Sequence, residues 1–277
     1  MQYGKTIEMF LVDGDAGGLV TAELSNWNGK AIKIPRTMVK DCVRDDIKGV
    51  GVYFLFCEED GKDAVYIGEA ENVLERLNRH LQDYQAGKEG YYWTTAIAFI
   101  GRDLNKALIR YLEDRIWVEV NECGRAKNLT KSTYKRTVLK ESQIASMEEF
   151  IENVKVLLSA LGYRALTPMP KAEDDTVYLF CHSIRGTQAK GFVSDGGFTV
   201  LKGSKVSGGV VKSFVEQGGN YYSLRCKLEA DGTIVDGAFQ TDFEFSAPSA
   251  ASAVVLGRTS NGNVDWRTED GTKLKDL

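Results

Sequence analysis

The chain has 277 residues, a net charge of −4 and 43% hydrophobic residues, which together suit two modest globular domains and exclude a disordered or fibrous chain. The acidic balance argues mildly against nucleic-acid binding, which would need a local basic patch. Five scattered cysteines without a CxxC pair, no apolar run of membrane-spanning length and no signal sequence predict a cytoplasmic protein with reduced thiols and no zinc.

Residues 1–45 are predicted to form a small β segment packed on the following domain. Short β-rich runs separated by turn residues occur at 7–12, 19–24 and 31–34. Trp27 and Arg36 are assigned no chemistry, because such side chains more often close a small core or its rim.

Two further β-rich runs follow, at 52–56 and 64–67, and the Asp60-Gly61 pair between them is a hairpin signal. The runs carry Tyr53 and Tyr66. The sequence therefore predicts two tyrosines on paired strands.

A helix is predicted next. Its buried stripe consists of apolar residues at helical spacing, namely Val73, Leu74, Leu77, Leu81 and Tyr84. Arg76 and His80 are one turn apart on another face, together with Asn72 and Glu69. An arginine and a histidine facing two tyrosines form a polar cluster that a plain core does not need.

A third strand is predicted over 94–100, followed by a long helix capped by Asp103 or Asn105. Glu113 lies at or beside the apolar stripe of that helix. A carboxylate in that position needs a partner, because burying an unpaired charge is costly. If spacing alone is considered, an ion pair with Arg110 or another basic residue explains the position of Glu113.

This arrangement resembles the GIY-YIG nucleases, whose two motifs appear here as Gly51-Val52-Tyr53 and Tyr66-Ile67-Gly68. The family's arginine lies ten residues beyond the second tyrosine, which is the position of Arg76. The resemblance implies a small α/β nuclease domain over 46–140, with a three-stranded sheet flanked by helices. It also implies the catalytic residues Tyr53, Tyr66, Arg76, His80 and Glu113.

By the same resemblance, Glu113 holds a single Mg²⁺ or Mn²⁺ ion and Arg76 braces the phosphate oxygens. Tyr66 is the candidate general base, assisted by Tyr53 or His80. Some family members carry lysine directly after the second motif, where this chain has Glu69. Three interpretations of Glu69 stay open: a second metal ligand, a partner for Arg76, or a mark of reduced activity.

Substrate contacts are expected after the long helix. Asn128 is a looser match to the family's asparagine in this region. The window 122–140 is the most basic in the chain and suits a phosphate backbone, although such a run is equally often a solvated loop. The substrate-binding residues expected there are Asn128, Lys131, Lys135 and Arg136.

Residues 141–175 are predicted to form a helix and a linker. Ser146 with Glu149 three residues later is a capping-box pattern, and Gly162 ends the apolar stripe. The linker is indicated by a Pro-rich run at 167–170 and an acidic run at 173–175.

Residues 176–277 are predicted to form a separate small α+β domain. Strands are expected at 177–181, 191–193 and 198–201, strands or short helices at 220–229 and 239–245, and a helix within 246–257. Trp266 is expected in the core.

This last third resembles a domain of uncharacterised function found C-terminal to GIY-YIG nuclease domains, through 198–204, 246–251 and Asn261-Gly262. It is also similar to the restriction-enzyme and adenine-methylase-associated domain, proposed to bind modified DNA. That family's usual Asn-Gly-Trp appears here as Asn261-Gly262-Asn263, with Trp266 three residues later.

Three functions from different classes follow. The first is a metal-dependent DNA endonuclease with a C-terminal targeting module, in restriction, defence or repair. The second is a catalytically weak or inactive nucleic-acid-binding protein, and the third is an interaction protein whose tyrosines and Glu113 satisfy one another. The presence of all five catalytic residues favours the first.

Overall fold

The computed structural model describes residues 4–59, 62–131, 137–217 and 219–277. The chain forms two compact units, Met1–Pro168 and Met169–Leu277. Within the described ranges, no helix has both the length and the apolarity needed to cross a membrane. The hairpin signal Asp60-Gly61 lies outside the described residues.

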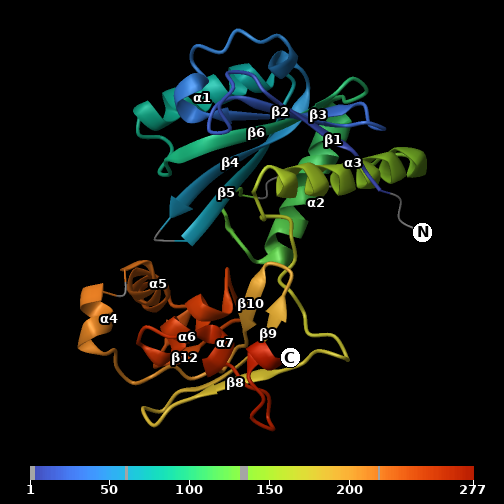
Figure 1. Ribbon diagram of the computed structural model, residues 1–277. Coiled ribbons are helices and arrows are strands. Elements are labelled where there is room, and N and C mark those ends of the chain that lie inside the picture. The colour runs from blue at the N-terminus through green and yellow to red at the C-terminus, as the bar shows by residue number, and fades with distance from the viewer. Residues whose placement is uncertain (1–3, 60–61, 132–136, 218) are drawn as a thin grey trace. The chain divides into compact units, whose positions relative to one another are not determined.

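The N-terminal unit is built on one sheet, whose described strands lie in the order β1-β2-β3-β6-β4-β5-β7. Figure 1 shows β6, β4 and β5 side by side in this sheet. The strands are β1 (Ile7–Leu11), β2 (Val20–Leu24), β3 (Gly29–Pro35), β4 (Gly51–Glu59), β5 (Lys62–Ala70), β6 (Trp93–Gly101) and β7 (Lys127–Asn128). The β5–β7 pair is parallel and the other neighbours are antiparallel.

The three-stranded sheet expected for residues 46–140 is therefore part of a larger sheet, and the strands β1, β2 and β3 of the N-terminal segment extend it instead of packing on it. β3 pairs with β6 from Gly29 opposite Gly101 to Pro35 opposite Thr95. This pairing covers the backbone groups of β6 that would otherwise form an exposed edge. The broader expectation of a mixed α and β fold is confirmed.

Helices cover both faces of this sheet. α1 (Val73–Gln85) packs on one face, together with the short turns η1 (Arg36–Met38) and η2 (Asp46–Lys48), and α2 (Lys106–Cys123) and α3 (Glu141–Ala160) pack on the other. Successive side chains of β4 alternate between the two cores: Phe54 joins the α2 and α3 side, and Tyr53 joins the α1 side. Both faces of β4 are therefore buried.

α3 begins at Glu141 and not at Ser146, where the sequence pattern placed its start. The first turn is closed by two bonds: the Gln143 N–H donates to the Lys140 carbonyl at 2.9 Å, and the Lys140 N–H donates to the Gln143 side chain at 3.1 Å. Inside the helix, the Ser146 hydroxyl donates back to the Ser142 carbonyl at 3.0 Å. The helix therefore begins five residues before the Ser146 capping pattern.

The C-terminal unit contains a four-stranded sheet in the order β13-β10-β9-β8 and a short β11–β12 pair within its described residues. Its elements are β8 (Leu179–His182), β9 (Gln188–Ser194), β10 (Gly197–Val200), α4 (Lys212–Gln217), α5 (Gly219–Ala230), β11 (Ile234–Val235), β12 (Ala238–Phe239), β13 (Phe243–Phe245), α6 (Pro248–Leu256), α7 (Gly262–Asp265) and η3 (Leu274–Asp276). The ambiguous run at 220–229 is thus helical, and the run at 239–245 is divided between two strands.

The residues that carried the C-terminal resemblance tie α6 to α7. The Trp266 indole is fully buried, and its N–H donates to the Pro248 carbonyl at 3.0 Å. The Gly262 N–H donates to the Ser249 hydroxyl at 3.1 Å, and a Cβ on Gly262 would overlap the Pro248 backbone. These motif residues therefore have structural roles in the core of the unit.

Candidate active site

Strands β4 and β5 bring the two motif tyrosines onto the face that α1 covers. Tyr53 lies opposite Gly68 in the pairing register, and Tyr66 lies two residues before Gly68, so both rings project to one side. A Cβ on Gly68 would overlap the Tyr53 ring, so this glycine provides the space in which the ring lies. The ring centroids of Tyr53 and Tyr66 are 6.3 Å apart.

Helix α1 adds the arginine and the histidine. Its N-cap Asn72 accepts a hydrogen bond from the Glu75 N–H at 3.1 Å, which sets the start of the helix. Arg76 Nε donates to the Tyr53 hydroxyl at 3.2 Å, and His80 Nε2 is 2.8 Å from the same oxygen. The spacing expected from the sequence thus brings both side chains to Tyr53.

His80 is completely buried, and its second ring nitrogen, Nδ1, hydrogen-bonds Glu89 in the loop after α1. Burial, and then the charges of Arg76 and Arg36, lower the pKa of His80 to about 3. The ring is therefore neutral, and its contact with Glu89 is a hydrogen bond and not an ion pair. The sequence analysis missed Glu89, because residues in a loop have no periodicity that indicates their direction.

Neither tyrosine loses its proton unaided. Burial raises the pKa of Tyr53 far above its ordinary value and also raises that of Tyr66, and the charge of Arg76 offsets only part of each effect. Tyr53 is fully buried and has a hydrogen-bonding nitrogen beside its hydroxyl, whereas Tyr66 is partly exposed. The two phenols are chemically distinct.

Glu113 reaches the same cleft from α2. It is only 6% exposed, and its Oε2 has no hydrogen-bond partner among the described residues. Burial, and then the nearby charge of Glu69, raise the pKa of Glu113 to about 7. The ion pair with Arg110 suggested by spacing is not what holds this carboxylate.

Glu69, the residue after the second motif, binds Lys106 at the start of α2. Lys106 Nζ is 2.7 Å and 2.8 Å from the two carboxylate oxygens, and the Glu69 side chain is 7% exposed. Glu69 is therefore the partner of a lysine from another element, and Arg76 interacts with the two tyrosines. A cation is thus present beside the second motif, although it comes from α2.

A cleft of about 420 Å³ brings these groups together, and its lining includes both tyrosines, Arg76, Glu69, Lys106 and Glu113. On β5, its lining residues follow the two residues that pair with β7, Ala64 and Val65. The hydroxyl of Thr130 then bonds the Ile67 backbone N–H at 2.6 Å and its carbonyl at 2.9 Å. The edge of β5 that follows Ile67 borders the cleft.

The four residues expected to contact the substrate differ in where the structure places them. Asn128 holds its own loop, since its side-chain oxygen accepts from the Thr130 N–H at 3.0 Å and its amide donates to the Trp117 carbonyl at 3.4 Å. Lys131 is exposed. Lys135 and Arg136 lie outside the described residues, so their role stays a prediction.

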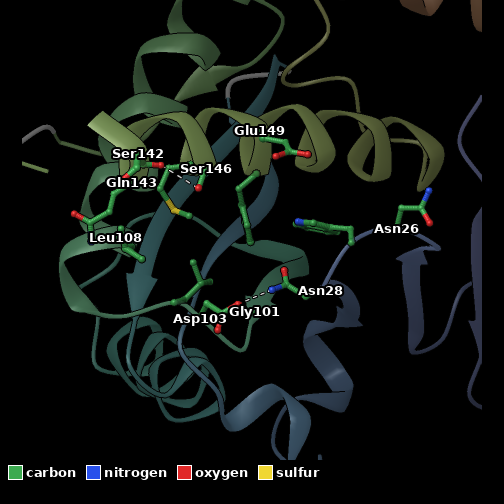
Figure 2. A pocket seen from close by; sticks show the side chains of 13 residues that line it. Asn26, Asn28, Gly101, Asp103, Leu108, Ser142, Gln143, Ser146 and Glu149 are labelled. Atoms are coloured by element: carbon green, nitrogen blue, oxygen red, sulfur yellow. Dashed lines mark hydrogen bonds between the residues drawn. The ribbon is translucent and has the colours of Figure 1, made fainter. Parts of the chain in front are cut away.

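A second cavity, of about 660 Å³, lies between the β2–β3 turn, the β6–α2 loop and α3 (Figure 2). Asn28 donates to Asp103 at 2.7 Å, and the Trp27 ring meets the edge of Phe150 with centroids 4.8 Å apart. Ser146 and Glu149 lie on α3 across from Asn28 and Asp103 (Figure 2). The Trp27–Phe150 contact packs α3 against the sheet, in agreement with the structural role expected for Trp27.

The cleft offers a metal ion few protein ligands. Within the described residues, no three or more His, Cys, Asp and Glu side chains are grouped to hold a metal ion. A buried carboxylate oxygen without a partner still fits a hard divalent cation that takes its other ligands from water and phosphate. Among the carboxylates that line the cleft, Glu113 meets this description.

Comparison with known proteins identifies only the C-terminal unit. Residues 179–277 match a family described as "Domain of unknown function (DUF4357)", which confirms the expected uncharacterised domain. No curated protein and no solved structure matches the chain, and no GIY-YIG family model matches it. The C-terminal unit is thus similar to DUF4357. The N-terminal unit resembles the GIY-YIG nucleases only through the motifs described above.

Proposed function

We propose that the N-terminal unit is a metal-dependent DNA endonuclease that hydrolyses phosphodiester bonds. The observation that supports this most is the convergence in one cleft of two phenols, the Arg76 guanidinium and the Glu113 carboxylate. Phosphodiester hydrolysis needs an activated water and stabilisation of charge on the phosphate, and these groups supply both. The interaction-protein alternative is disfavoured, because Glu113 and the tyrosines do not satisfy one another.

Glu113 would hold the Mg²⁺ or Mn²⁺ ion. The bound cation would polarise the phosphate and neutralise its developing charge. A pKa near 7 means that the carboxylate is readily ionised when a cation is offered, because the cation removes the penalty of burying the negative charge.

Tyr53 is the stronger candidate for the base, although the sequence pointed to Tyr66 with Tyr53 or His80 assisting. The Tyr53 hydroxyl lies 2.8 Å from His80 Nε2, which accepts its proton when the ring proton is on Nδ1. The attacking water gives a proton to the Tyr53 oxygen, the phenol proton passes to His80, and the new P–O bond forms as the old one breaks. The leaving oxygen takes its proton from solvent.

Arg76 and Lys106 supply positive charge for the phosphate. The planar guanidinium of Arg76 suits two non-bridging oxygens, and its Nε bond to Tyr53 keeps the side chain at the cleft. Lys106 lines the same cleft with its side chain 39% exposed while bound to Glu69. Residues 176–277, within the C-terminal unit, would hold or choose the DNA, as the resemblance of that segment suggests.

A second candidate is DNA binding without turnover. Glu69 favours it, because its charge raises the pKa of Glu113 and opposes a second negative group in the cleft. Incubation with plasmid and branched DNA, with Mg²⁺ or Mn²⁺ and then with a chelator, separates the two. Cleavage that the chelator and Glu113→Gln both abolish is expected, and binding without cleavage under all conditions would leave the second candidate.

A further inference from the structure

A buried carboxylate lies behind the Tyr53–His80 pair. Glu89 has a side chain only 15% exposed, one oxygen of which hydrogen-bonds His80 Nδ1. Its other oxygen is buried and has no hydrogen-bond partner among the described residues. Burying a carboxylate with an unpaired oxygen beside a fully buried imidazole lowers the stability of the fold, so the contact calls for a functional explanation.

The contact determines which nitrogen of His80 carries the proton. A carboxylate only accepts, so Glu89 takes the hydrogen bond of an Nδ1–H. The neutral ring then has a lone pair on Nε2, which is the nitrogen 2.8 Å from the Tyr53 hydroxyl. Arg76 donates to the same hydroxyl from Nε at 3.2 Å, so the phenol oxygen accepts from Arg76 while its proton points at His80.

We propose that Glu89 is a positioning residue that holds His80 in the Nδ1–H tautomer, so that His80 accepts the proton of Tyr53. The inference rests on the proposed nuclease function of this cleft. In the step, the O–H bond of Tyr53 breaks and an N–H bond forms at Nε2. The imidazolium that results lies against the Glu89 carboxylate, and Arg76 holds the phenolate until it takes the proton of the attacking water.

The protonation state of the Glu89–His80 pair changes with pH near neutrality, because of the groups around it. The charged or titratable groups that face Glu89 and His80 are Tyr53, Tyr66, Arg76, Asp83, Tyr91 and Arg36. Burial, and then the charge of Asp83, raise the pKa of Glu89 to about 7. As the pH falls through this value, a protonated Glu89 donates to Nδ1, the ring proton lies on Nε2, and His80 ceases to accept from Tyr53.

The tautomer is directly measurable, because the chain has two histidines and His182 is exposed. Nitrogen NMR of isotope-labelled histidine rings, with His182→Gln for assignment, gives the protonated nitrogen of His80. Above pH 7 the wild type is expected to show Nδ1–H. Glu89→Gln replaces the carboxylate by an amide whose oxygen is a weaker acceptor and whose N–H can donate to Nδ1, so it is expected to shift His80 towards Nε2–H and to cleave at least about a hundredfold more slowly, with the fold unchanged.

Two further variants complete the test. Asp83→Asn removes a neighbouring charge that bonds Lys88 at 3.7 Å and not His80, so both tautomer and rate should stay as in the wild type above pH 7. Glu89→Asp keeps the carboxylate and should keep Nδ1–H with a smaller loss of rate, which also serves if Glu89→Gln fails to fold.

Nε2–H in the wild type above pH 7, or wild-type cleavage by a variant with Nε2–H, would overturn the positioning role. A wild type that cuts no DNA would end the proposed function, while the tautomer result would still decide whether Glu89 sets the proton on His80. The NMR readout is needed because Glu113 also has a pKa near 7, so the pH dependence of the rate alone does not separate the two groups.

Discussion

Glu113→Gln should stabilise the protein at alkaline pH while it abolishes metal-dependent cleavage. Burial, and then the charge of Glu69, raise the pKa of Glu113 from an ordinary 4.5 to about 7, so the folded protein holds this proton more tightly than the unfolded chain. Stability from this group is fully present below pH 4.5 and decreases as the pH rises towards 7. Above pH 7 the penalty of the buried charge is complete.

The size of the effect follows from that pKa. At about 1.4 kcal/mol for each tenfold change in proton affinity, the rise from 4.5 to about 7 corresponds to about 3 kcal/mol. No discount for solvent screening applies, because Glu113 is 6% exposed. For a unit of this size, 3 kcal/mol is a shift of roughly 6–12 °C in Tm.

Thermal unfolding of wild type and Glu113→Gln across the pH range measures this difference. The variant should match the wild type near pH 4 and melt higher at pH 8 in the transition of the N-terminal unit. Added Mg²⁺ should raise the Tm of the wild type alone, because only an ionised carboxylate gains from the cation. A variant that is equally destabilised at both pH values would show that a partner already holds the Glu113 carboxylate, and the metal-site reasoning would be wrong.

Substitutions at four other positions test the cleft. Gly68→Ala should cost about 1–3 kcal/mol in chemical denaturation, because the added Cβ overlaps the Tyr53 ring, and unchanged stability would contradict that packing. Arg76→Ala should lower the single-turnover cleavage rate by about a hundredfold or more, with only partial recovery in Arg76→Lys, whereas equal rates for alanine and wild type would remove the phosphate clamp. Lys106→Met should weaken DNA binding and make its salt dependence shallower, while Glu69→Gln should tighten binding; a salt dependence unaltered in both would mean that their ion pair is only structural.

Local pattern predicted the elements that build the cleft. The two β-rich runs became β4 and β5, and the apolar stripe after them became α1 with Arg76 and His80 one turn apart. Those relations are short in sequence and obey the fixed periods of strand and helix, so spacing is enough to place the side chains. The direction in which Tyr53 faces followed from the same reasoning.

The contacts that spacing did not reveal join distant or irregular segments. Glu69 and Lys106 come from a strand and a helix separated by β6, so only the tertiary fold brings them together. Glu89 lies in a loop, and the lack of a partner for Glu113 depends on everything that surrounds it. The pairing of β3 with β6 is likewise non-local, which is why residues 1–45 were expected as an attachment to the nuclease sheet and not as part of it.

The β3–β6 pairing also determines which truncated fragments of this protein can fold without aggregating. β3 is mostly buried, and just after it Arg36 lies on the faces of Tyr84, Tyr92 and Trp93, with its guanidinium carbon 4.5–4.7 Å from their centroids. A fragment cut at the motif boundary would lose this arginine and leave β6 as a long apolar edge open to other chains. Such a fragment should form aggregates, so the shortest soluble piece that keeps the cleft includes the N-terminal strands and ends near Pro168.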